Sequence, residues 1–280
     1  MKNNSGVALI VVLWILVILE VVIGGLVYIA RLQARISNYR YRECQARAIS
    51  RSGIERVIGT IYEIQGQKNI DESFPEIYPR SLSGEIGDGQ YAIRLVNEES
   101  KINLNTASKA VLEKVFVASD LTNSAIVLDL VCQYHANGWK LKTIRELLLH
   151  ENISEEMVAK IGAIATVNSN GKININTVSA ELLKDLPGMT AKEAEKIINY
   201  RIGLDHLSGT IDDQYIDEKI LSQLIDGAII NQNKELFCYQ AETFQAVCTA
   251  CYDRIYRKIT AYLYYDAINR AVKIIYWQED

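Results

Sequence analysis

The sequence predicts an α+β protein: a long N-terminal helix packed on an antiparallel sheet, with a large, mostly helical domain inserted into the chain. Three observations support this prediction. They are an apolar N-terminal segment that continues into an arginine-rich one, a repeated Lys-Ile-Asn motif, and alternating apolar residues on both sides of that repeat. The length of 280 residues, with 49% hydrophobic and 23% charged residues, fits such a globular chain.

Composition and motifs exclude several classes of function. The net charge is −4, so the chain lacks the excess of basic residues that is typical of a nucleic-acid-binding protein. The three histidines, His135, His150 and His206, lie far apart and form no HExxH pattern. The sequence also has no Walker A loop, no Gly-x-Ser-x-Gly and no Gly-x-Gly-x-x-Gly. We therefore expect no enzyme activity, no catalytic residue and no organic cofactor. A membrane-anchored enzyme without a local signature has no positive support.

The N-terminus holds the most informative segment. Residues 1–6 are a short polar leader that ends in glycine, and residues 7–30 are apolar over the length that crosses a bilayer. A cleaved secretory signal fits poorly because no Ala-x-Ala-like site follows; a plain signal anchor is the alternative. The pattern predicts that the helix continues to about Ile58 as an amphipathic, arginine-rich segment.

Glu20 is the single charge inside the apolar segment. A carboxylate at that depth costs about 2.5–3.5 kcal/mol on insertion scales. Two interpretations stay open. Glu20 contacts a partner subunit within a bundle of apolar helices, or it is a tolerated charge that is protonated or faces water.

An internal repeat organises the middle of the chain. Residues 101–108 (KINLNTAS) and 172–179 (KININTVS) match at six of eight positions. Each copy alternates apolar and polar residues and ends in Asn-Thr, whose side chains we expect to cap the following helix. The helices that follow present apolar faces, and these comprise Val111, Leu112 and Val115 in the first copy and Leu182, Leu183 and Leu186 in the second.

The second copy predicts a helix-hairpin-helix unit. A Pro187-Gly188 turn precedes a capping box of Thr190 and Glu193, and Gly203 is a helix stop. In the first copy, Thr122 is the candidate cap and Gly138 the candidate stop.

Units of this kind often bind DNA phosphates through the backbone amides of a Gly-hydrophobic-Gly turn. Here the turn reads Gly-Met-Thr over residues 188–190, and Lys192 and Lys196 are balanced by Glu193 and Glu195. We therefore expect this unit to pack helices or contact protein.

Alternation on both sides of the repeat predicts the strands. Tyr91, Ile93 and Leu95 share one face of a strand that follows a turn at residues 87–89. Three more strands are expected near the C-terminus, with a hairpin connection at residues 266–270; they cover residues 247–252, 255–264 and 272–277. The helical domain would then be inserted between the first strand and the strands that return.

The leader and apolar helix resemble the class III signal of type IV pilins and pseudopilins. In that family a prepilin peptidase cuts after the glycine, which implies cleavage between Gly6 and Val7 and methylation of Val7. Most members carry glutamate at the fifth mature residue, which neutralises the amine of the subunit ahead. This chain has Val11 there, which is similar to the K-type minor pseudopilins of type II secretion. A subunit without that carboxylate has no charge to neutralise the amine of a subunit ahead, which implies a position at the filament tip.

The resemblance to K-type pseudopilins covers essentially the whole chain. It includes a Gly-x-Gly-x-Tyr pattern at residues 87–91, the acidic pair Glu98 and Glu99, the segment 101–105 and Trp277. It implies five parts, namely a leader (1–6), a transmembrane segment (7–30), a periplasmic helix with the first strands (31–100), an inserted helical domain (101–234) and the returning strands (235–280).

The family's role implies a minor pseudopilin that nucleates or caps the type II secretion pseudopilus and supports export of folded proteins across the outer membrane. Implied partners are I- and J-type minor pseudopilins, the major pseudopilin, the assembly platform, the prepilin peptidase and the inner membrane. The C-terminal domain would lie in the periplasm after a single span, with no nucleic acid bound. The alternative is a type IV pilus or DNA-uptake component whose helix-hairpin-helix unit binds DNA.

Some pseudopilins bind calcium, and Glu98, Glu99 and Asn103 offer oxygen ligands here, although the EF-hand spacing is absent. A solvated acidic turn at the domain junction is the alternative that we prefer.

Five cysteines are an odd number, so at least one is free or pairs between chains. Cys248 and Cys251 have redox-motif spacing, but residues three apart in a strand point to opposite faces. A disulfide at Cys238 and buried free thiols are both open.

Overall fold

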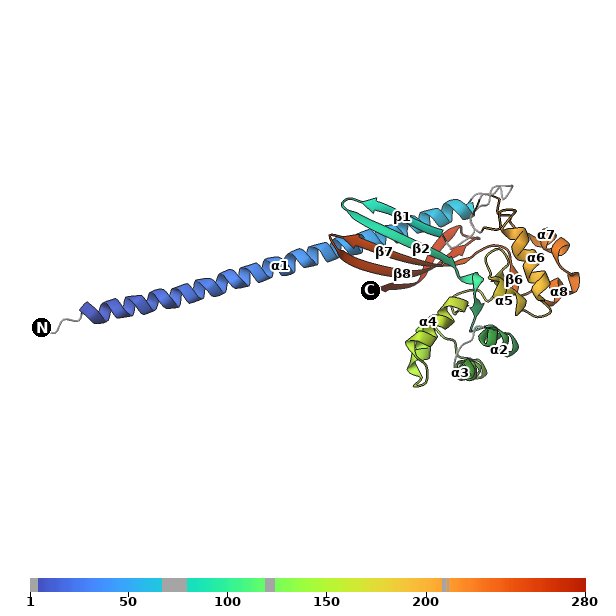
Figure 1. Ribbon diagram of the computed structural model, residues 1–280, viewed down its shortest axis with the longest axis horizontal. Coiled ribbons are helices and arrows are strands. Elements are labelled where there is room, and N and C mark those ends of the chain that lie inside the picture. The colour runs from blue at the N-terminus through green and yellow to red at the C-terminus, as the bar shows by residue number, and fades with distance from the viewer. Residues whose placement is uncertain (1–4, 67–79, 119–123, 208–209, 211) are drawn as a thin grey trace.

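The computed structural model describes residues 5–66, 80–118, 124–207, 210 and 212–280. Figure 1 shows one long helix, α1 (Ser5–Gly66), that projects far from a head made of a sheet and an inserted helical domain. The inserted domain lies at the end of the sheet away from the N-terminus. The predicted α+β architecture is confirmed.

The head is built on a five-stranded antiparallel sheet in the order β1-β2-β7-β8-β9. Its strands are β1 (Arg80–Ile86), β2 (Gly89–Asn97), β7 (Thr243–Tyr252), β8 (Ile255–Asp266) and β9 (Ala271–Glu279). The four strands expected from alternation are confirmed. β1 was not predicted because its sequence, RSLSGEI, has only two apolar side chains and little alternation.

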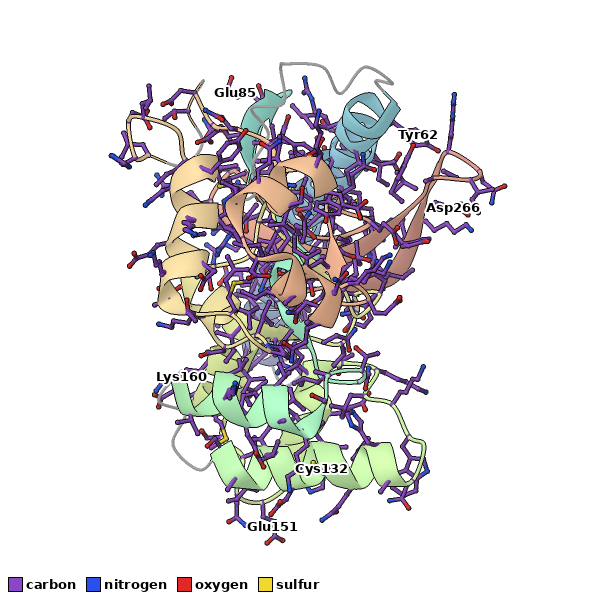
Figure 2. All side chains as sticks on the ribbon, turned by 90° about the vertical axis from the view of Figure 1, so that its right-hand side faces the viewer. Tyr62, Glu85, Cys132, Glu151, Lys160 and Asp266 are labelled. Atoms are coloured by element: carbon purple, nitrogen blue, oxygen red, sulfur yellow. The ribbon has the colours of Figure 1, made fainter. Side chains whose placement is uncertain are left out.

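The C-terminal half of α1 covers one face of the sheet. Ile49, Ile54, Val57 and Ile61 are buried there at helical spacing, in one core with apolar residues of the strands. The helix ends at Gly66 and not near Ile58, since Ile61 still packs on the sheet. Figure 2 looks at the head end-on, with Tyr62 beside the β8–β9 hairpin that carries Asp266. The Tyr62 hydroxyl accepts a hydrogen bond from the Val272 N–H at 3.4 Å.

The N-terminal half of α1 has no protein around it. Its large apolar side chains from Leu9 to Ile29 are all exposed. Within the described residues, α1 is the one helix long and apolar enough to cross a membrane.

The insertion leaves the sheet after β2 and folds into two lobes of similar layout. The first lobe contains β3 (Ile102–Asn103), α2 (Lys109–Ala118), α3 (Ser124–Ala136), a 3-10 segment (Ile144–Leu149), α4 (Glu155–Ile164) and β4 (Ala165–Thr166). The second contains β5 (Ile173–Asn174), α5 (Ala180–Lys184), α6 (Ala191–Arg201), α7 (Glu218–Leu224), α8 (Gly227–Gln232) and β6 (Phe237–Cys238).

Each lobe is closed by a short parallel pair, β3 with β4 and β5 with β6. β6 therefore belongs to the insertion, which extends past residue 234 to the start of β7 at Thr243. The six apolar residues expected to face the core of the two lobes are buried. Gly138 and Gly203 follow α3 and α6 with φ of +68° and so act as helix stops, while Thr122 lies outside the described residues.

The two Asn-x-Asn motifs join segments within each lobe. Asn176 accepts from the Ile216 N–H at 2.8 Å and donates to the carbonyls of Ile216 and Tyr239. Asn105 makes the equivalent bonds in the first lobe, accepting from the Leu141 N–H at 2.8 Å and donating to the Leu141 carbonyl at 2.9 Å.

The expected capping role of Asn-Thr is therefore wrong in the second copy. The cap of α5 is Ser179, whose Oγ accepts from the Leu182 N–H, because both polar ends of the preceding asparagine are already bonded within the lobe. The expected cap Thr190 of α6 is confirmed; its Oγ1 accepts from the Glu193 N–H.

Candidate assembly helix and domain junction

The predicted N-terminal site residues lie on one continuous helix. Gly6 and Val7 fall in the first turns of α1, and the leader residues 1–4 lie outside the described residues. Val11 is 51% exposed, and Glu20 is exposed on the same rod. This half of α1 is therefore available in full to a membrane or to other helices.

The predicted acidic pair lies where the insertion leaves the sheet, beside Asn97. Asn97 donates from Nδ2 to the Thr177 Oγ1 at 3.0 Å in the second lobe. Glu98 accepts from the Thr166 hydroxyl at the end of the first lobe. Glu99 accepts from the Thr243 N–H at 3.1 Å, where the chain returns to the sheet. Three consecutive side chains thus bind three different segments, and we call residues 97–99 the junction.

Glu98 and Glu99 are buried, so the solvated acidic turn that we expected here is wrong, and the electrostatics of the junction follow from that burial. Glu98 also pairs with Lys101 at 2.9 Å, with side chains 1% and 10% exposed. Two charges out of water stay stable only when paired and hydrogen-bonded, as they are here. Glu99 has no cation partner among the residues the structure describes. Loss of solvent raises its pKa to about 7, against the lowering effect of the Thr243 N–H.

The junction does not fit a calcium site. Asn103 donates from Nδ2 to the Ser169 carbonyl at 2.7 Å, and its Oδ1 accepts from the Asn105 N–H at 2.8 Å. The carboxylates of Glu98 and Glu99 are likewise bonded to donors of this chain. Calcium takes six to eight oxygen ligands, and these oxygens already accept hydrogen bonds from donors of this chain. No group of three His, Cys, Asp or Glu in the described part of the chain could hold a metal ion.

All five cysteines are free thiols in the structure. Cys248 is buried against α1, while Cys251 lies on the other face of β7, as strand geometry predicts. Burial raises the pKa of Cys238 to about 12 and that of Cys248 to about 11, so neither is a thiolate at neutral pH.

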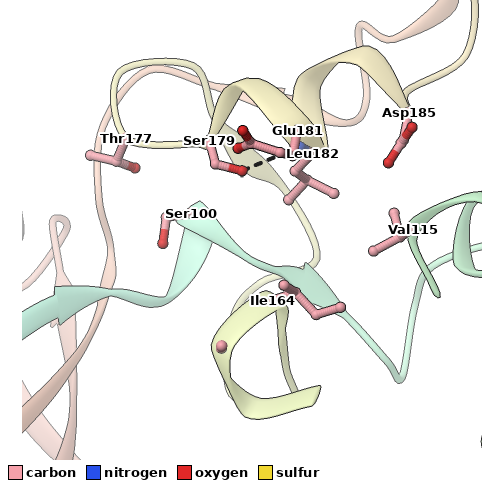
Figure 3. A pocket seen from close by; sticks show the side chains of 9 residues that line it. Ser100, Val115, Ile164, Thr177, Ser179, Glu181, Leu182 and Asp185 are labelled. Atoms are coloured by element: carbon pink, nitrogen blue, oxygen red, sulfur yellow. Dashed lines mark hydrogen bonds between the residues drawn. The ribbon is translucent and has the colours of Figure 1, made fainter. Parts of the chain in front are cut away.

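A small cavity of about 150 Å³ lies between the lobes (Figure 3). Hydroxyls of Ser100, Thr177 and Ser179 and the carboxylates of Glu181 and Asp185 line it over an apolar floor. The dashed line in Figure 3 marks the Ser179 Oγ accepting from the Leu182 N–H, which fixes that hydroxyl as a helix cap. The residues that line the cavity include no histidine or cysteine.

The helix-hairpin-helix turn packs against its own lobe. The Asn233 side chain donates to the Pro187 carbonyl at 2.8 Å, and a Cβ on Gly188 would meet the Gln232 side chain at 2.5 Å. After the turn, Arg201 ends α6 and donates to the carbonyls of Ile175 and Val178. Sequence reasoning missed this role of Arg201, although a charge on an apolar helix face was a usable signal.

Comparisons with known proteins agree with this description. Residues 168–207 match the helix-hairpin-helix motif family, which is the second lobe's hairpin unit. No curated protein matches the sequence. Among solved structures, the chain is similar to one in the crystal structure of the GspK-GspI-GspJ complex from the enterotoxigenic Escherichia coli type 2 secretion system. The TM-score is 0.64 and the identity 13%, over 87% of this chain and 99% of that chain.

The class of fold is therefore that of a pseudopilin, in which a long anchoring helix packs on an antiparallel sheet. Within that class, the two-lobed insertion and the coverage of the matched chain define a GspK-like minor pseudopilin fold.

Proposed function

We propose that this protein is a minor pseudopilin of a type II secretion system, anchored in the inner membrane with its head in the periplasm. The observation that carries the proposal is the division of α1: its front half is apolar and wholly exposed, and its rear half is fixed to the sheet. The similarity to a chain of a GspK-GspI-GspJ complex supports I- and J-type partners. The protein acts through helix packing and surface contacts, and we propose no catalysis.

Cleavage and methylation at the N-terminus test this proposal. We expect the membrane-extracted protein to begin at an N-methylated Val7 when a prepilin peptidase is present, and at Met1 when it is absent. Intact mass and N-terminal sequencing distinguish the two. A chain that begins at Met1 under both conditions would be an ordinary signal-anchored protein and would contradict the pseudopilin assignment.

Val11 supports a position at the tip of the filament, since an apolar residue there has no charge for the amine of a subunit ahead. We expect Val11→Glu to let the subunit enter the body of the filament, measured as more copies per sheared pseudopilus. Val12→Glu is the control, because it adds the same charge at nearly the same depth on another helix face. If Val11→Glu assembles and secretes as the unaltered chain does, the missing carboxylate does not define the role.

Binding of DNA by the hairpin unit remains the weaker candidate. Its turn lies against α8, and the lysines beside it are balanced by glutamates. We therefore assign this unit to the packing of the second lobe.

A further inference from the structure

The segment of α1 that follows the apolar half carries unpaired positive charge. Residues 21–42 contain four arginines and no aspartate or glutamate. Arg42 pairs with Asp253 at 2.8 Å. In the part of the chain that the structure describes, no carboxylate forms an ion pair with Arg31 or Arg35, and both are exposed.

The first acidic residue that follows these two arginines along the helix does not neutralise them. Glu43 is held by Arg257 at 2.8 Å and by Arg47 at 3.3 Å. The hydrogen bond from Arg257 is the main reason that the pKa of Glu43 is lowered. Glu43 therefore belongs to the head's own ion pairs.

The two arginines lie at the depth of lipid headgroups. Arg31 follows the apolar segment directly, and Arg35 lies about 8 Å beyond Ala30 at 1.5 Å per residue. The headgroup layer adds about 5–8 Å to each side of the hydrocarbon core. Residues four apart share a helix face, so both guanidinium groups point to the same side. Tyr28, 69% exposed, is the kind of aromatic residue that sits at this boundary.

We propose that Arg31 and Arg35 form a binding site for the headgroups of anionic phospholipids in the leaflet from which the head emerges. A guanidinium binds a phosphate oxygen pair through two parallel N–H donors, which suits two arginines on one face. The site fixes the depth and the rotation of α1 in the bilayer. This inference rests on the proposed membrane anchoring.

The test compares lipid retention by the full-length chain. The chain is placed in nanodiscs with equal amounts of phosphatidylglycerol and phosphatidylcholine, and mass spectrometry of the released protein counts the lipids still bound. We expect the unaltered chain to prefer phosphatidylglycerol. Arg31→Gln/Arg35→Gln should reduce that preference about 25-fold, at about fivefold per arginine.

The matched control is Lys140→Gln/Lys142→Gln, which removes two exposed charges in the insertion and should leave the preference unchanged. Equal retention of both lipids by the unaltered chain, or an equal loss in the control, overturns the lipid site. An unaltered preference in the arginine variant also overturns it. If the unaltered chain enters no disc, the proposed membrane anchoring itself fails, and this inference with it.

Discussion

At the scale of single residues, each carboxylate of the acidic pair at the junction is buried and held by its own hydrogen-bond donors. Glu98 and Glu99 are adjacent, yet the first forms an ion pair with Lys101, whereas burial raises the pKa of the second to about 7. Their environments, and not their residue type, set these states. Sequence pattern located both carboxylates at the domain boundary, but their internal donors were not predictable because Thr166 and Thr243 are distant in the chain.

Glu99 makes stability depend on pH. Below about pH 4.5 its carboxyl is protonated in both the folded and the unfolded chain. As the pH rises to about 7, only the unfolded chain ionises, so the free energy of unfolding should fall by on the order of 3 kcal/mol and then stay level. We expect Glu99→Gln to remove this fall, as measured by urea unfolding of the detergent-solubilised chain at pH 5 and pH 8.

The control for that experiment is the exposed Glu151→Gln, which should keep the full dependence on pH. The same slope in Glu99→Gln and in the unaltered chain would show that another group causes it.

At the scale of elements, close approach of α1 to the sheet decides which glycines matter. A Cβ on Gly53 would lie 2.5 Å from the Cys248 Sγ, whereas a Cβ on Gly59, six residues along the same helix, meets nothing within 4 Å. The sequence shows two equivalent helical glycines. Only the packing of β7 against α1 makes one of them necessary.

We expect Gly53→Ala to lower the free energy of unfolding by about 1–3 kcal/mol through overpacking. Gly59→Ala should raise it by up to about 1 kcal/mol, because alanine favours the helix. Urea unfolding of the three chains measures both changes. In Gly53→Ala/Cys248→Ala the added methyl occupies the space of the lost sulfur. The double variant should therefore lose less free energy of unfolding than the sum of the losses in the two single variants. Additive losses would mean that the two residues do not touch.

The repeat was also predictable as an element, but its function was not. Pattern alone placed a Lys-Ile-Asn motif before each of two helices, and both helices are present, each preceded by a short strand within the motif. The role of Asn105 and Asn176 needed the fold, since each bonds a loop some 36 to 40 residues away.

At the scale of the whole molecule, the exposed apolar half of α1 lies apart from the head. The four arginines after the apolar segment ordinarily keep the residues that follow on the cytoplasmic side. A periplasmic head therefore requires insertion by a route that overrides this bias, and its orientation is directly testable.

Cys44 provides the probe, because it is the one exposed thiol of the five. We expect a membrane-impermeant maleimide to label Cys44 in spheroplasts, where the outer face of the inner membrane is accessible. Cys44→Ser should lose this labelling and serves as the control. Labelling that appears only after the membrane is broken would place the head in the cytoplasm.

Local pattern correctly predicted the apolar half of α1, the alternating strands, the repeat and the glycines that end α3 and α6. Hydrophobic periodicity and glycine conformation depend on residues close together in the chain, so they can be recognised in the sequence alone. Four features were not predictable from pattern, namely the end of α1, strand β1, the boundary at Thr243 and the bonds of residues 97–99. Each of these depends on groups far apart in the chain, whose burial and partners exist only after the sheet and the two lobes have come together.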